Sequence, residues 1–428
     1  MSCGPLHPFT PLPIHLLFLT DNFPPEVNAP ATRTYEHCRE WVRQGVRVTV
    51  ITCAPNFPHG RVYEGYRNRL WQREEVDGIT VIRVWSYVTA NAGFAKRILD
   101  YLSYALMATV ASLFVRTDLV VATSPQFFTA VAGYMAGLLK RKPWVMEVRD
   151  LWPESIRAVG AAPGKERWLD RLERLELFLY RKAARVVVVT NAFRDNLTRR
   201  GVPEQKIAVV TNGVLLGQFK RRPKDPELLR SLGLEGRFVV GYLGTHGLAH
   251  KLDFILDCAP AAAPNVHFLF IGGGAQKAEL LARVEREKFP NVTMLPPVPK
   301  DDIARYISVT DLALVPLRRS DTFKTVIPSK IFENAAMGKP ILLGVEGEAA
   351  AIIRRYDAGE CFVPEDRADF LRALTRLATD PARYAHCQQG CTELAAAYDR
   401  NTLARDMLQV LREVCFPHTV SGSAENRR

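Results

Sequence analysis

The stretch FVVGYLGTHGLAHKLD, residues 238–253, runs from an apolar β-strand through a glycine-containing turn into a helix. A short apolar run followed by a helical stretch is typical of a parallel strand with its crossover helix. Three further runs repeat this pattern downstream: HFLFIGGG (267–274), DLALVPL (311–317) and KPILLGV (339–345). The second half of the chain therefore predicts an open, doubly wound parallel sheet.

The first half of the chain shows the same alternation of strands and helices. Its apolar runs are HLLFLT (15–20), RVTVIT (47–52), ITVIRVW (79–85), DLVVAT (118–123), PWVMEV (143–148), RVVVVT (185–190) and KIAVV (206–210). We therefore expect an α/β protein built from two Rossmann-like domains, each with a doubly wound parallel sheet.

A polar segment with the run KRRPKDP (220–226) separates the two patterns. We expect an N-terminal domain over residues 1–213, a linker over 214–236 and a C-terminal domain over 237–398. Apolar residues at helical spacing predict a C-terminal helix within 399–418 that packs back toward the N-terminal domain. The polar tail, 419–428, is expected to fray.

Composition limits the classes of partner. The 428 residues are 47% hydrophobic, enough for two cores, and carry a net charge of +12, of which +9 lies in residues 1–213. This charge favours an anionic partner, but nucleic acid is not expected, because no basic patch with interleaved aromatic residues occurs. The eight cysteines form no CxxC pair and no signal peptide is evident, so we expect a cytoplasmic protein with reduced thiols.

The loops after the strands are where ligands of open α/β sheets bind. The loop that follows 238–243 offers glycines, a hydroxyl and a lysine at a helix start, which suit a pyrophosphate. An ordinary strand-to-helix turn is the alternative. The candidate pyrophosphate-binding residues of this loop are Gly244, Thr245, His246, His250 and Lys251. Gly272, after the next strand, permits close approach of a ligand.

A second cluster is KTVIPSKIFENAAMGKP, residues 324–340. Pro328 or Ser329 is expected to begin a helix, with Lys330 in its first turn and Glu333 one turn on. A cation in the first turn opposes the helix dipole, and a bound phosphate would offset that cost. Glu333 could accept hydrogen bonds from a ribose diol, or could simply balance Lys330 as a surface pair.

Two further candidates lie in the first half. Arg149 and Asp150 follow the run 143–148, where a guanidinium can grip phosphate and a carboxylate can orient sugar hydroxyls, although such pairs in turns are often structural. The first loop, residues 21–33, offers small residues and a helix N-terminus to an anion. It lacks GxGxxG, so NAD binding is not expected.

Together these stretches resemble family 4 of the GT-B glycosyltransferases, and specifically the WbuB-like subgroup that builds bacterial surface polysaccharides. The resemblance spans nearly the whole chain. It is carried by FPPEVNAPATRTYEHC (23–38), CAPNFPHGRVYEGY (53–66), KRILDYLS (96–103), TSPQFFTAVAGY (123–134), EVRDLWPESI (147–156), YLGTHGLAHKLD (242–253), SDTFKTVIPSKIFE (320–333) and GKPILLGVEGEA (338–349).

The resemblance implies two domains that face each other across a cleft, with a nucleotide-diphosphate sugar, foremost a UDP-sugar, in the C-terminal one and the acceptor in the N-terminal one. The implied donor residues are Gly244, Thr245, His246, His250, Lys251, Gly272, Val298, Lys324, Thr325, Ser329, Lys330 and Glu333. The implied acceptor residues are Asn28, Ala29 and Arg33, and the transfer is assigned to Asp150, Arg149 and Lys330.

The resemblance also implies retention of anomeric configuration and transfer of a hexose or an N-acetylated amino-deoxyhexose. The implied acceptor is a polyprenyl-diphosphate-linked saccharide at the inner face of the cytoplasmic membrane. No DxD motif occurs, so neither a metal nor another cofactor is required by the sequence, and basic side chains would stabilise the leaving group. Without paired carboxylates, a same-face displacement is favoured over a covalent intermediate.

Membrane contact has its own sequence signal. Lys96 and Arg97 precede the apolar stretch 98–115, which is too short to span a bilayer but could lie against anionic lipid. A buried crossover helix is the alternative.

The chain departs from the wider family at three places. Thr325 stands where the first glutamate of a Glu-x7-Glu motif is usual, Thr245 stands where an arginine is usual, and Asn28-Ala29 replaces a glycine-rich pair. Either His250 or Lys251 could fill the family's basic position. Two other functions fit the same architecture, namely a sugar-nucleotide epimerase and a catalytically silent sugar-nucleotide-binding subunit.

Overall fold

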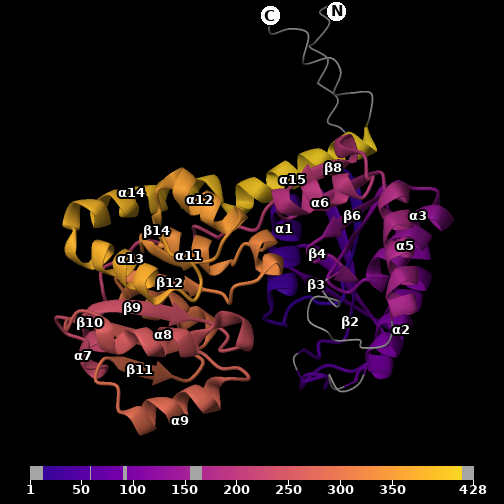
Figure 1. The fold of residues 1–428 in the computed structure, drawn as a ribbon. Coiled ribbons are helices and arrows are strands. Elements are labelled where there is room, and N and C mark those ends of the chain that lie inside the picture. Colours follow the sequence, from indigo (N-terminus) through magenta and orange to yellow (C-terminus); the bar gives the residue numbers. More distant parts are fainter. Residues whose placement is uncertain (1–12, 58, 90–93, 155–165, 417–428) are drawn as a thin grey trace, which may run out of the picture. The chain divides into compact units, whose positions relative to one another are not determined.

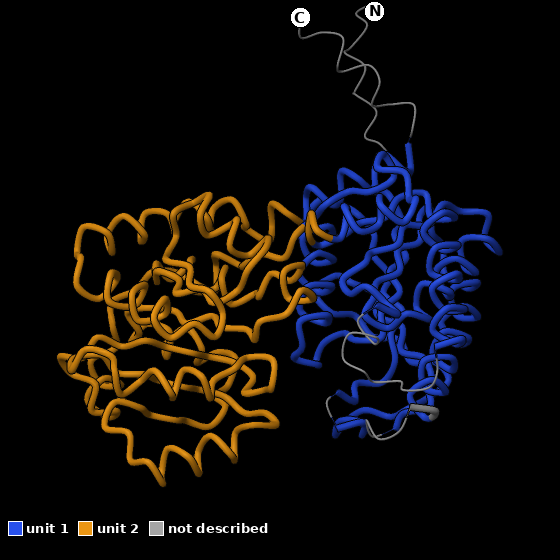
Figure 2. The backbone as a smooth tube through the Cα atoms, in the orientation of Figure 1, with its two compact units in different colours: residues 1–189, 193–210, 404–428 blue, residues 190–192, 211–403 orange. Residues whose placement is uncertain are grey.

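The structure is a computed structural model that describes residues 13–57, 59–89, 94–154 and 166–416. The chain divides into two compact units, shown in Figure 2. Unit 1 comprises residues 1–189, 193–210 and 404–428, and unit 2 comprises 190–192 and 211–403. The predicted tail, 419–428, lies outside the described residues, as do 417–418 of the predicted C-terminal segment and 155–156 of EVRDLWPESI.

Unit 1 is built on an eight-stranded sheet in the order β3-β4-β2-β1-β5-β6-β7-β8. Its strands are β1 (His15–Leu19), β2 (Arg47–Cys53), β3 (Trp71–Val76), β4 (Ile79–Val84), β5 (Leu119–Thr123), β6 (Trp144–Val148), β7 (Arg185–Val188) and β8 (Ile207–Val209). The helices of this part of the chain are α1 (Ala29–Arg43), α2 (Phe94–Leu113), α3 (Phe128–Lys140), α5 (Glu166–Lys182) and α6 (Asn191–Arg199), labelled in Figure 1.

Every strand pair of this sheet is parallel except β3 with β4, which the sequence analysis did not predict. Asp77 and Gly78 connect these two strands with positive φ angles of 50° and 77°. Two successive residues at positive φ form the tight turn whose twist matches an antiparallel hairpin. β3 therefore adds an antiparallel edge to a sheet that we expected to be wholly parallel.

The last helix of the chain, α15 (Arg400–Cys415), packs on unit 1 from Ala404 onward. The indole nitrogen of Trp41, on α1, donates a hydrogen bond of 2.7 Å to the carbonyl of Ala404. Both Trp41 and Met407 are fully buried. Unit 1 is thus completed by a helix that begins 191 positions after its last strand ends, since β8 ends at Val209 and α15 begins at Arg400.

Unit 2 is built on a six-stranded, fully parallel sheet in the order β11-β10-β9-β12-β13-β14. Its strands are β9 (Phe238–Leu243), β10 (Val266–Ile271), β11 (Val292–Leu295), β12 (Leu312–Pro316), β13 (Ile341–Gly344) and β14 (Gly359–Cys361). Its helices are α7 (Pro226–Ser231), α8 (Leu252–Cys258), α9 (Lys277–Glu287), α10 (Ile303–Ser308), α11 (Lys330–Ala336), α12 (Glu348–Tyr356), α13 (Arg367–Thr379) and α14 (Pro381–Ala397).

The segment 214–236, which we expected to be a linker, is packed into unit 2. Val214 and Phe219 are buried in its core, and Leu228 of α7 joins a second cluster with Val239. Asp225 begins α7 by accepting a hydrogen bond of 2.8 Å from the Leu228 amide, as an N-cap residue does. The apolar residues within this polar segment explain the difference from the prediction.

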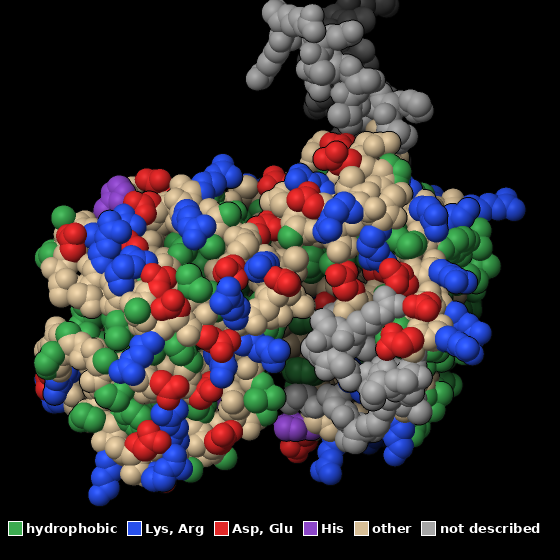
Figure 3. Space-filling view, viewed as in Figure 1, with side chains coloured by type: hydrophobic (Ala, Val, Ile, Leu, Met, Phe, Trp, Pro, Cys, Tyr) green, Lys and Arg blue, Asp and Glu red, His purple; other side chains and the backbone are tan. Residues whose placement is uncertain are grey.

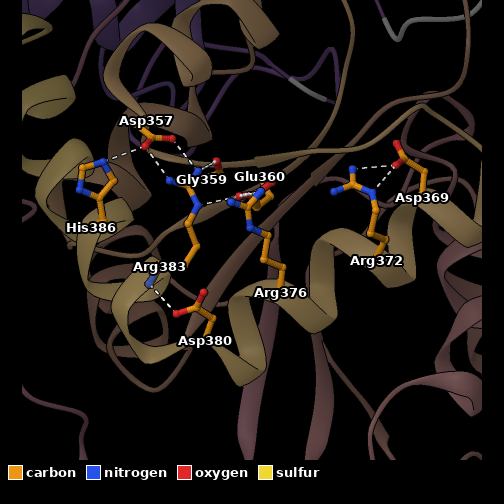
Figure 4. Close-up of polar contacts among 9 residues, drawn as sticks. All are labelled: Asp357, Gly359, Glu360, Asp369, Arg372, Arg376, Asp380, Arg383 and His386. Atoms are coloured by element: carbon orange, nitrogen blue, oxygen red, sulfur yellow. Dashed lines mark hydrogen bonds and ion pairs between the residues drawn. The ribbon is translucent and has the colours of Figure 1, made fainter.

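The open edge of the unit 2 sheet is held by ionic contacts (Figure 4). Arg383, on α14, pairs with both carboxylate oxygens of Asp357, at 2.5 and 2.6 Å, and with Glu360 of β14 at 2.7 Å. Arg376, on α13, reaches the same Glu360 carboxylate at 3.3 Å. Two helices are thereby tied to the last strand.

Candidate functional site

The carboxyl end of β9 holds a compact group of residues that we call the Lys330 cluster: Tyr242, Gly244, His246, His250 and Lys330. The Nζ of Lys330, the first residue of α11, lies 3.9 Å from the centre of the Tyr242 ring. No carboxylate among the described residues forms an ion pair with this amine. Burial lowers the pKa of Lys330 to about 7, and the nearby charge of Glu333 opposes that shift only in part.

Two imidazoles complete the cluster on either side of Tyr242. The rings of His246 and His250 lie 5.8 and 5.9 Å from the Tyr242 ring. His246 is fully buried, and no group among the described residues forms a well-aligned hydrogen bond with either of its ring nitrogens or with Nδ1 of His250. Burial lowers the pKa of both histidines to about 4, helped by the charges of Lys277 and Lys330 at His246 and by the charge of Lys330 at His250, so both rings are neutral at pH 7.

Glycines allow this part of the backbone to be tightly packed. Gly244, directly after β9, has a φ of 145°, and a Cβ there would come within 2.9 Å of Lys330 Nζ. A Cβ on Gly272 would collide with the carbonyl oxygen of Gly244. The His246 amide donates a hydrogen bond of 2.8 Å to the carbonyl of Gly273. The loops after β9 and β10 are therefore in direct contact, and only glycine fits where they meet.

Two predicted donor lysines are engaged elsewhere. Lys251 Nζ donates a hydrogen bond of 2.9 Å to the Asp253 carboxylate and lies 3.9 Å from Glu365, and the hydrogen bond to Asp253 raises the pKa of Lys251. Lys324 is exposed and pairs with Asp321 at 2.7 Å. Of the two candidates for the basic position, His250 belongs to the Lys330 cluster, whereas Lys251 is neutralised by carboxylates.

The remaining predicted donor residues lie on elements of the same unit. Glu333 is half-buried, on α11 one turn from Lys330, and Ser329 stands at the N-cap of that helix without a side-chain hydrogen bond. The Thr325 hydroxyl donates to the carbonyl of Thr322 at 2.9 Å. Thr245 is exposed, and its carbonyl accepts a hydrogen bond of 2.6 Å from the Tyr242 hydroxyl. Val298, after β11, packs against the apolar cluster that includes Ile271.

A second group of predicted residues meets at the carboxyl ends of β1 and β6, within unit 1. Asn28 caps α1: its Oδ1 accepts from the Ala31 amide at 2.8 Å. The Arg149 guanidinium donates to the carbonyls of Ala29 and Pro30, at 3.1 and 3.2 Å. The amides of Arg149 and of half-buried Asp150 both donate to Ser124 Oγ, at 2.7 and 3.3 Å. Arg149 therefore fastens the start of α1 to the end of β6.

Arg33 does not lie at the surface, where we expected an acceptor residue. Its side chain is 3% exposed and pairs with Glu147 through Nε at 2.9 Å, and its Nη2 donates to the Val210 carbonyl at 2.9 Å. Burial alone would raise the pKa of Glu147, but the charges of Arg33 and Arg149 and the hydrogen bond from Thr123 outweigh it and lower that pKa. This buried pair stabilises the sheet beneath the first loop.

The sequence analysis missed three residues that shape these two groups. Tyr242 lies within an apolar strand, where the sequence pattern cannot distinguish it from an ordinary residue of the hydrophobic core. Glu147 is a single acid within the buried run 143–148, and a carboxylate there requires a buried cation, which is a usable signal. Lys277, on α9, donates to the Leu295 carbonyl at 2.7 Å, and its charge contributes to the low pKa of His246.

Comparisons with known proteins agree with this architecture. Residues 28–213 match the glycosyl transferase 4-like domain, and residues 237–380 match the glycosyl transferases group 1 domain. The chain carries both domains of a GT-B glycosyltransferase. The Lys330 cluster lies in the glycosyl transferases group 1 domain, and Asn28, Arg149 and Asp150 lie in the glycosyl transferase 4-like domain.

Among curated proteins, these GT-B domains are 30% identical over 139 residues to TuaH of Bacillus subtilis, a candidate glycosyltransferase of teichuronic acid biosynthesis. That match covers 32% of this chain and 34% of TuaH. The D-inositol 3-phosphate glycosyltransferase of Thermobispora bispora is 26% identical over 239 residues, covering 53% of this chain and 54% of that protein. The chain thus spans about a third to a half of these two relatives.

Solved structures resemble the GT-B fold over nearly its full length. HepE of Anabaena, crystallised with UDP and glucose, has a TM-score of 0.69 at 17% identity, covering 94% of this chain and all of that one. The sucrose-phosphate synthase of Thermosynechococcus elongatus has a TM-score of 0.71 at 14% identity, covering 94% of this chain and 99% of that one. At these identities the likeness concerns the fold.

Proposed function

We propose that the chain is a retaining, metal-independent glycosyltransferase. It would move a hexose or an N-acetylated amino-deoxyhexose from a nucleotide-diphosphate sugar, foremost a UDP-sugar, to a lipid-linked saccharide in polysaccharide biosynthesis. The acceptor class and the cytoplasmic, membrane-peripheral location rest on the resemblance to the WbuB-like subgroup.

The observation that carries the proposal is the state of Lys330. A half-buried amine without a carboxylate partner, beside glycines that admit a ligand to the backbone, is an unfavourable arrangement unless an anion supplies the missing charge. The diphosphate of a nucleotide sugar supplies it. As the bond to the sugar breaks, charge develops on that diphosphate, and protonated Lys330 would stabilise the leaving group.

The other residues of the Lys330 cluster support the same assignment. His246 and His250 are neutral at pH 7, so each ring carries one N–H. We expect His250, which is half-buried, to donate it to a phosphate oxygen, whereas His246 is fully buried in the cluster. Glu333, one turn along α11, is placed to accept hydrogen bonds from the ribose diol. Lys251 and Lys324 would stay outside the diphosphate contact, because carboxylates already neutralise them.

In unit 1, we propose a positioning role for Arg149, supported by its contacts with the start of α1. Its guanidinium holds the carbonyls of Ala29 and Pro30, so it would keep Asn28 and the first loop in place for the acceptor instead of gripping phosphate. Asp150, on the same turn, would orient the hydroxyls of the transferred sugar.

Calorimetry with UDP, GDP, ADP and TDP, with and without EDTA, tests the donor class. Tight binding of UDP that EDTA leaves unchanged is expected; EDTA-sensitive binding would contradict metal independence. NMR of the product should show the anomeric configuration of the donor. Epimerised nucleotide sugar without an acceptor would favour an epimerase instead. UDP binding without sugar transfer would favour a catalytically silent subunit, the alternative suggested by Thr325 in place of the usual glutamate.

A further inference from the structure

Helix α2 is apolar on two opposite faces. Tyr104, Ala108 and Ser112 face the core and are fully buried. Leu106, by contrast, is 65% exposed and Phe114 is 78% exposed. The outward residues recur every three or four positions and form one stripe, which we call the α2 surface: Leu99, Leu102, Leu106, Val110, Leu113 and Phe114. The structure thus shows a helix that is only half buried.

The α2 surface continues onto neighbouring elements. The ring of Trp71, which begins β3, lies 6.4 Å from the ring of Phe114 in an edge-on arrangement, and both are exposed. Lys140, at the end of α3, donates a hydrogen bond of 3.4 Å to the carbonyl of Leu113, the last residue of α2. The exposed Leu138 and Leu139 of α3 therefore lie near the C-terminal end of α2. A contiguous apolar area of this kind is unusual on a monomeric protein and marks an interaction site.

Basic residues border this apolar area. Lys96 and Arg97 lie at the start of α2, Arg116 lies two residues after Phe114, and Lys140 and Arg141 lie at the end of α3. Lys140 is half-buried, and the other four are exposed. The neighbouring carboxylate Asp118 is partly offset by Lys142 at 3.6 Å. Figure 3 shows hydrophobic and basic side chains next to each other along the edge of unit 1 that carries α2, α3 and α5 in Figure 1.

We propose that the α2 surface docks onto an anionic lipid bilayer, with its leucines and the Trp71–Phe114 pair in the headgroup region and the bordering cations on the lipid phosphates. A leucine stripe with aromatic residues at one end and cations on its border matches the chemistry of a bilayer interface. Among the described residues, no helix is long and apolar enough to cross a membrane, so α2 would lie along the surface.

The docking face adjoins the loop that we assign to the acceptor, and in this respect the inference rests on the proposed function. The Tyr104 hydroxyl donates to the carbonyls of Thr20 and Ile51, at 2.7 and 2.9 Å. The middle of α2 is therefore level with the carboxyl ends of β1 and β2, where the first loop begins. A bilayer against Leu99 and Leu102 would bring a lipid-linked saccharide to that loop.

Flotation of the full chain with vesicles tests the proposal without any activity measurement. Wild-type protein should float with vesicles of phosphatidylcholine and phosphatidylglycerol, and less with phosphatidylcholine alone or at high salt. Leu106→Gln combined with Phe114→Gln should lower the partition coefficient roughly tenfold or more. Arg116→Glu combined with Lys140→Glu should reduce binding to the anionic vesicles only. Leu281→Gln, which alters an exposed leucine on α9 of unit 2, should float as wild type.

The docking proposal would be wrong if the wild-type chain did not float, or if the Leu106→Gln/Phe114→Gln variant floated as well as wild type. It would also be wrong if light scattering showed that the wild-type chain is a dimer and that the Leu106→Gln/Phe114→Gln variant is a monomer. That result would make a second copy the occupant. Nucleotide binding, measured on the same preparations, shows that each variant is folded and separates the two proposals. A wild-type chain that binds UDP but does not float would contradict the docking proposal alone. A wild-type chain that floats but does not bind UDP would contradict the transferase proposal alone.

Discussion

Lys330 Nζ lies 3.9 Å from the centre of the Tyr242 ring and 2.9 Å from the position that a Cβ on Gly244 would occupy. The face of an aromatic ring attracts a cation, but far less strongly than a carboxylate does in a poorly solvated site. The ring therefore orients the amine without neutralising it. This leaves the cationic charge of Lys330 for a ligand.

Nucleotide affinity should depend on the protonation of Lys330. Because its pKa in the free protein is about 7, and an anion binds the protonated form, the affinity for UDP should fall roughly tenfold per pH unit above pH 7 until the pKa of the complex is reached. Calorimetry between pH 7 and pH 9 in two buffers of different ionisation enthalpy would also reveal proton uptake on binding. Lys330→Arg should give a flat profile; an equally steep one would assign the titration to another group.

Tyr242 should contribute through its ring. Tyr242→Phe keeps the cation–π contact and loses only the hydrogen bond to the Thr245 carbonyl. Tyr242→Leu loses both and should weaken UDP binding by about 1 kcal/mol more than Tyr242→Phe does. Affinities from calorimetry and melting temperatures for both variants provide the comparison. Equal affinities would show that the ring does not orient Lys330.

Glu333 should make the protein bind a ribonucleotide more tightly than a deoxyribonucleotide. Glu333→Ala should weaken UDP binding by about 1.5–3 kcal/mol, the value of hydrogen bonds to a charged group. Its effect on deoxy-UDP should be smaller, because that ligand lacks one of the hydroxyls. Competition binding with both ligands checks this expectation. If the variant weakens both ligands equally, Glu333 acts through the charge it places beside Lys330.

The buried Arg33–Glu147 pair should matter for stability. Glu147→Gln leaves the Arg33 guanidinium buried with less compensation and should cost about 3–5 kcal/mol of unfolding free energy, whereas Arg33→Met with Glu147→Leu should recover much of it. Because the folded-state pKa of Glu147 is lowered, its contribution is present above the unfolded value and is lost as pH falls through the folded value. Denaturant unfolding at neutral and acidic pH measures both effects, with UDP binding as a check on unit 2. A cost that does not change with pH would contradict the assignment.

The sequence predicted most strands because those of a parallel sheet are continuous apolar runs. It missed β3, whose residues WQREEV (71–76) alternate between exposed and half-buried, although Asp77-Gly78 is a recognisable hairpin turn. It placed Lys330 and Glu333 one turn apart, since helix spacing fixes local geometry. It could not place Arg33, because its partner Glu147 lies 114 positions away and only the sheet brings the two together.

The ionic contacts of Arg383 and Arg376 with Glu360 have a consequence for the behaviour of the chain in concentrated solution. β14 is the terminal strand of its sheet, and a terminal strand offers main-chain groups to which another polypeptide could add. An incoming strand would have to displace or desolvate these paired charges and the helices that they anchor. We therefore expect the charged cluster in Figure 4 to disfavour the addition of a strand from another molecule to β14, and so to reduce aggregation.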